Sequence, residues 1–134
     1  MVGNKMRLRF DRVEVRPDAE NQVRVEVTFT FGLRTIVTTA VSENMRPGIL
    51  KAASIASLEA VQAASDRKFT CAVEDLDRVN ALGKQVIAVL VNVEFEGRQF
   101  QVFGSCQIDD DDLAAAVRAT LNATNRIVDL ATRA

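Results

Sequence analysis

The chain has 134 residues, 48% of them hydrophobic and 26% charged, and its seventeen basic residues are matched by eighteen acidic ones. This balance lacks the basic excess typical of surfaces that bind nucleic acid or anionic membranes, so we expect neither partner. No apolar run approaches the ~20 residues of a membrane span, and the two cysteines form no CxxC pattern. We therefore expect one cytoplasmic domain, residues 1–134, with free thiols.

The chain contains no histidine. Histidine is the most common acid–base residue in catalysis and the most common metal ligand in proteins. Its absence lowers the expectation of an enzyme, although carboxylates, lysine or cysteine can also do chemistry. We expect no catalytic residues, no metal site and no cofactor.

Residues 6–15 are predicted to form the first strand. Apolar residues change parity along it, because Phe10 and Val13 would point to opposite faces of a regular strand. A β-bulge near Asp11-Arg12 would return them to one face. The turn that follows has the composition Pro-Asp-Ala-Glu-Asn, in residues 17–21.

The clearest strand is Gln22–Phe31, in which Val and Phe alternate with Arg, Glu and Thr. Such alternation predicts one buried and one solvated face. Gly32 supports a tight turn into a second strand, Arg34–Val41, to form a hairpin. A helix is predicted from Pro47-Gly48 to about Ala64, because proline is tolerated in the first turn of a helix.

The same pattern then begins again. The predicted elements are strands at Phe69–Val79, Gln85–Phe95 and Arg98–Ile108, and a helix from Asp109–Asp112 to about Ala131. Ala56-Ser57-Leu58-Glu59-Ala60 is echoed 63 residues later by Ala119-Thr120-Leu121-Asn122-Ala123. We predict an α+β fold with a duplicated βββα module, residues 6–65 and 69–131. Its two pseudo-symmetric halves would form a mostly antiparallel sheet with two helices on one face.

The segment 86–91 is apolar at both parities. A strand of this kind must be covered on both faces. The helices would cover one face, and either a second subunit or loops of the same chain would cover the other. We name Val86, Ala88 and Leu90 as candidate interface residues.

Two features invite a chemical interpretation. The four aspartates 109–112 are typical of a helix N-terminus, where one caps the helix, although clustered carboxylates also bind divalent cations weakly. Cys106 precedes the same helix and is either a core residue or a nucleophile. Gly104 and Ser105 would let the backbone approach a ligand at the helix start.

The second half resembles the C-terminal regulatory domain of 2-isopropylmalate synthase-type enzymes, here as a stand-alone domain. The resemblance rests on residues 89–98, on Gly104 with its acidic turn, and on Leu121-Asn122-Ala123-Thr124-Asn125-Arg126. It implies a duplicated βββα fold that dimerises and binds a feedback amino acid through loops before the helices. In this chain those loops hold the candidate ligand-binding residues Gly104, Ser105, Asp109, Ser42 and Asn44.

We therefore predict a non-catalytic regulatory or assembly module that self-associates, as a homodimer. Its further partner would be a small acidic metabolite such as an amino acid, or another protein. One alternative is a structural subunit of a larger complex, which predicts an exposed apolar strip on the even-numbered face of Val86–Leu90. The other is a small enzyme that uses carboxylates or Cys106, which predicts perturbed pKa values in a cleft.

Overall fold

Both halves of the chain fold into three strands followed by a helix, which confirms the duplicated βββα module. The computed structural model describes residues 7–133. Its elements are β1 (Leu8–Ala19), β2 (Gln22–Phe31), β3 (Arg34–Glu43), α1 (Arg46–Ala64), β4 (Phe69–Ala81), β5 (Lys84–Phe95), β6 (Arg98–Gln107) and α2 (Asp112–Arg133). None of these helices is long and apolar enough to cross a membrane.

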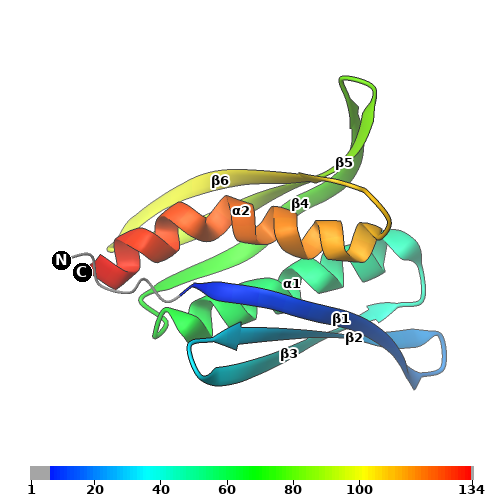
Figure 1. Cartoon of the computed structure of the whole chain (residues 1–134), viewed down its shortest axis with the longest axis horizontal. Coiled ribbons are helices and arrows are strands. Elements are labelled where there is room, and N and C mark those ends of the chain that lie inside the picture. Colours follow the sequence, from blue (N-terminus) through cyan, green and yellow to red (C-terminus); the bar gives the residue numbers. More distant parts are fainter. Residues whose placement is uncertain (1–6, 134) are drawn as a thin grey trace.

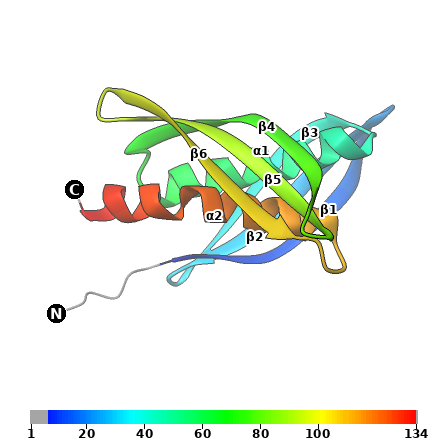
Figure 2. The same ribbon diagram turned by 90° about the horizontal axis from the view of Figure 1, so that it is seen from above.

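The strands form two separate antiparallel sheets, in the orders β1-β2-β3 and β4-β5-β6. Between residues 7 and 133 no strand of one sheet pairs with a strand of the other, so a single six-stranded sheet does not form. The two helices lie between the sheets (Figures 1 and 2). α1 packs mainly on β2, β3 and β4, and α2 packs mainly on β5 and β6.

The predicted alternation in β2 is confirmed, since Val25, Val27 and Phe29 are fully buried against the helices. The predicted bulge in β1 is also confirmed, because the β1–β2 register shifts between Phe10 and Arg12. β4 has a corresponding shift between residues 73 and 75. The bulge therefore recurs in both copies of the module, and in each it keeps apolar residues on the inner face.

The two helices run side by side in the same direction (Figure 1). They touch through the hydroxyls of Ser54 and Thr120, which are 2.6 Å apart and buried. Small residues are buried on several sides of α1, including Ala52, Ser54, Ala56 and Ser57. This distribution fits a helix covered by a sheet, a second helix and part of the other sheet, rather than a helix resting on one surface.

Candidate functional site

The sheet β4-β5-β6 has an outer face, the face turned away from the helices, that is partly apolar. The odd-numbered residues of β5 from Ile87 to Val93 are buried against the helices. The even-numbered residues Val86, Ala88 and Leu90 lie on the outer face and are only partly buried. The three candidate interface residues therefore share one surface.

Neighbouring strands extend this surface. Register pairing places Val79 of β4 beside Val86, and Phe103 of β6 beside Leu90. Phe103 is 65% exposed and Val79 is 37% exposed. We call the five residues Val79, Val86, Ala88, Leu90 and Phe103 the apolar strip. Sequence reasoning missed Val79 and Phe103, although Phe103 shares its parity with Gln101 and Ser105, which is a signal of a solvated face.

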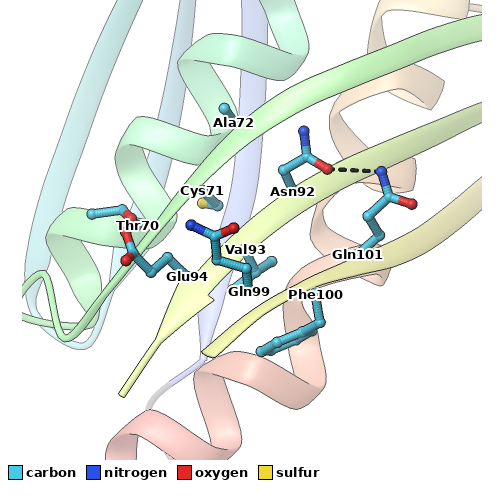
Figure 3. Close-up of a pocket in the computed structure, with 9 residues that line it drawn as sticks. All are labelled: Thr70, Cys71, Ala72, Asn92, Val93, Glu94, Gln99, Phe100 and Gln101. Atoms are coloured by element: carbon cyan, nitrogen blue, oxygen red, sulfur yellow. Dashed lines mark hydrogen bonds between the residues drawn. The ribbon is translucent and has the colours of Figure 1, made fainter. Parts of the chain in front are cut away.

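A groove lies on the same sheet, toward the β5–β6 turn (Figure 3). Its volume is about 580 Å³, and its lining residues are Thr70, Cys71, Ala72, Asn92, Val93, Glu94, Gln99, Phe100 and Gln101. Thr70, Glu94 and Gln99 contribute polar side chains, and Ala72 on the same face contributes an apolar one. We call this feature the amide groove. It was not anticipated from the sequence, because each of its residues alone is typical of an ordinary exposed strand.

Two side-chain hydrogen bonds cross all three strands at the border between the groove and the apolar strip. The Gln101 amide donates to the Asn92 carbonyl oxygen over 2.8 Å. The Asn92 amide in turn donates to the Glu74 carboxylate over 2.7 Å. This chain of bonds holds Asn92 and Gln101 in fixed orientations, as Figure 3 shows for the first bond.

The charge of the amide groove is negative. Glu94 is the only charged residue among those that line it. A carboxylate favours a cationic group nearby and disfavours a second anion. The groove therefore does not suit the small acidic metabolite expected from the sequence.

The outer face of the other sheet is different in character. It carries a ladder of exposed ion pairs, including Arg12–Glu14, Arg16–Glu26 and Arg24–Asp18. Exposed pairs of this kind contribute at most ~1 kcal/mol each and are well solvated. This face also exposes Val37 and Val41, but its charged surroundings give no continuous apolar strip.

The predicted ligand-binding residues before α2 have structural contacts. Gly104 is buried in β6, and its close backbone approach is to α2 rather than to an open loop. The Ser105 carbonyl oxygen accepts a hydrogen bond of 2.9 Å from the Asn122 side chain. Asp109 is exposed. Asp111 caps the helix, since its carboxylate accepts a 2.9 Å bond from the Leu113 backbone N–H.

The residues predicted before α1 lie at the same end of the molecule, because the two helices begin side by side (Figure 1). The Ser42 hydroxyl donates to the Glu43 carbonyl oxygen over 2.8 Å. Asn44 is exposed and lines a surface depression with Glu20 and Glu43. The structure thus brings both predicted loops to one end, but places Gly104 beneath a helix.

A buried carboxylate joins the halves at this end. Asp112, at the start of α2, accepts hydrogen bonds from Arg46 of α1 and, over 2.6 Å, from Arg78 of β4. Only 10% of the Asp112 side chain is exposed. The hydrogen bond from Arg46 is the main reason that the pKa of Asp112 is lowered, and the charge of Arg78 adds to it.

Removing this carboxylate should weaken the fold in a pH-dependent way. We expect Asp112→Asn to destabilise the protein by about 2 kcal/mol near neutral pH, because two arginines lose their shared acceptor. A lowered folded-state pKa stabilises the protein above the unfolded pKa of about 3.9, and that contribution is lost as pH falls through the folded value. The difference between variant and wild type should therefore be full near neutral pH and shrink as the pH falls below the unfolded pKa of about 3.9.

Urea unfolding followed by circular dichroism at several pH values measures this difference. Asp110→Asn is the matched control, since Asp110 is exposed in the same acidic run. A constant difference for Asp112→Asn across the whole pH range would contradict the assigned role of the ionised carboxylate.

Neither thiol is set up as a nucleophile. Burial raises the pKa of Cys71 to about 12. Burial also raises the pKa of Cys106, with a further contribution from Asp109. Thiol chemistry needs the thiolate, so both shifts disfavour it at neutral pH. Within residues 7–133, no cluster of three or more Cys, Asp and Glu side chains could hold a metal ion.

Comparison with known proteins adds no assignment. No family model and no curated protein sequence matches this chain.

Proposed function

We propose that the chain is a non-catalytic assembly module that self-associates through the outer face of β4-β5-β6. The observation that carries this proposal is β5, whose residues are apolar on both faces while its own chain covers only one. Loops of the same chain, the alternative that the sequence left open, do not bury the even-numbered face: Val86, Ala88 and Leu90 stay partly accessible.

Burial of the apolar strip against another surface would lower the free energy. Full burial of a Leu, Val or Phe side chain contributes about 1.5–3 kcal/mol relative to exposure. The apolar strip holds five apolar side chains in neighbouring positions, and Phe103 at its β6 end is mostly exposed. Two sheets pack face to face through alternate residues of this kind. A second copy of the same face would cover these side chains.

Light scattering across a dilution series tests the proposal. The chain has a mass of 14.7 kDa, and we expect about twice that value at high concentration, falling toward the monomer on dilution. A mass that stays at that of one chain up to millimolar concentration would contradict self-association.

A second candidate function is regulation by a small acid, as the family resemblance implies. It is supported by a cavity of about 310 Å³ beside the helix starts, lined by Arg46, Pro47, Leu50, Leu76, Asp77 and Arg78. The two guanidinium groups there are about half exposed. Repeating the light-scattering and melting measurements with a series of amino acids separates this regulatory role from a purely structural one, since only the former predicts a response.

A further inference from the structure

The turn between β4 and β5 carries an unusual residue. Leu82 and Gly83 both have positive φ, 53° and 78°, as a two-residue type I′ turn requires. Asn, Asp or Gly normally occupies the first position, because other side chains are strained there. Leu82 is moreover 102% exposed. Conformational strain combined with full exposure of a large apolar side chain points to a role outside the isolated fold.

The hairpin around this turn is built to reach outward. Every residue from 77 to 85 is exposed, and in Figure 1 the hairpin projects away from the two helices. Lys84 follows the turn and is the only basic residue that the register places on the outer face of this sheet. The tip therefore presents one aliphatic side chain next to one ammonium group.

The amide groove is complementary to this tip. It offers the Thr70 methyl group and the exposed Ala72 side chain for a leucine, and the Glu94 carboxylate for an ammonium group. Its volume of about 580 Å³ is large enough for both side chains. The groove and the tip lie on one sheet at opposite ends of the 12-residue strand β5, so a tip cannot reach the groove of its own chain.

We propose that the tip of each β4–β5 hairpin docks in the amide groove of a second copy, with Leu82 on the apolar atoms and Lys84 beside Glu94. This inference rests on the proposed self-association and specifies its geometry. A twofold axis across the strands, between Ala88 and Leu90, exchanges the two ends of the sheet and sets Lys84 of one copy opposite Glu94 of the other. Ala88 and Leu90 of the two apolar strips then meet at the centre, and two equivalent tip-to-groove contacts form at the ends.

The same axis has a consequence that distinguishes it from other face-to-face arrangements. Asp75 and Asp77 lie beside Leu90 and Ala88 in the register and are exposed. The axis places Asp75 of one copy opposite Asp77 of the other, where like charges oppose association. Asp77→Asn should therefore tighten the dimer. It would have no such effect if the twofold axis ran along the strands, so that the strands of the two copies pointed the same way.

The decisive experiment is a charge swap, read out as the dimer dissociation constant from sedimentation equilibrium. Lys84→Glu and Glu94→Lys should each weaken the dimer about tenfold or more, because each places like charges together at two contacts. The double variant should return to within about threefold of wild type. Single swaps that change nothing, or a double variant that is no tighter than the singles, would overturn the docking.

Leu82→Asn provides a second readout. Asparagine is preferred at this turn position, so the variant should fold at least as stably as wild type while dimerising about tenfold more weakly. Leu33→Asn is the control, since Leu33 is equally exposed at a turn of the other sheet. If Leu90→Glu dissociates the dimer but Leu82→Asn and both swaps do not, only the docking fails. A wild-type chain that is monomeric throughout would remove the self-association itself.

Discussion

A Gly104→Val variant is expected to lose about 3 kcal/mol or more of stability, and to be largely unfolded if the protein is marginally stable. Gly104 lies on the inner face of β6, directly beneath α2. A Cβ atom there would be 2.5 Å from the backbone nitrogen and 2.7 Å from the Cβ of Ala123, and closer still to the Ala119 carbonyl oxygen. Backbone atoms cannot rotate aside, so α2 would have to move away from the sheet.

Gly48→Ala is the matched control for this prediction. A Cβ at Gly48 would meet the Ser42 hydroxyl oxygen at 2.5 Å, but a serine side chain can rotate away. Alanine also favours a helix by up to about 1 kcal/mol over glycine. We therefore expect near wild-type stability, measured by denaturant unfolding with circular dichroism. A Gly104→Val protein as stable as wild type would show that α2 and β6 are not in close contact.

Leu90→Glu is expected to convert the dimer into a folded monomer. The Leu90 side chain lies on the outer face, so in a monomer the new carboxylate reaches water and the core stays intact. In the dimer it would be buried near the axis without a partner, which costs several kcal/mol and corresponds to a loss of about 100-fold or more in affinity.

Val37→Glu is the control for this second prediction. Val37 is 52% exposed on the outer face of the other sheet, where we place no interface. The two variants should have similar melting temperatures in dilute solution, but only Leu90→Glu should show the mass of one chain by light scattering. A well-folded Leu90→Glu variant with unchanged mass would contradict the proposed interface, and a misfolded one would place Leu90 in the core.

Much of the fold could be predicted because local periodicity determines it. The period-2 pattern of Gln22–Phe31 gave the limits of β2 as observed. A change of parity within the first strand was enough to predict the bulge, because a one-residue insertion is the simplest way to keep both halves facing the core. Because the sequence repeats at an offset of 63 residues, the same order of strands and helix could be predicted for the second half.

The pairing of strands across the halves could not be predicted in this way. Parity shows which face of a strand is buried, but it does not show what covers that face. A six-stranded sheet with helices on one side and two three-stranded sheets around a helix pair both bury the same residues of β2 and β5. The small residues on several sides of α1 were the one available signal that this helix is enclosed.

Only the apolar part of the candidate site could be predicted from the sequence. Val86, Ala88 and Leu90 stand out because three apolar residues alternate with buried ones in a single strand. The amide groove joins residues of three strands, and the Asp112 cluster joins residues 34 and 66 positions apart. Such distant neighbours follow from the topology, which the sequence pattern alone did not supply.

The central claim is that the outer face of β4-β5-β6 is buried between two copies. Its most direct test is an NMR experiment on a mixture of isotope-labelled and unlabelled chains, in which only contacts between different copies are detected. We predict contacts of the Leu90 methyl groups with the Leu90 or Phe103 side chain of another copy. Contacts confined to Val37 and Val41 of the other sheet, or a proven dimer without any contact at Leu90, would contradict the claim.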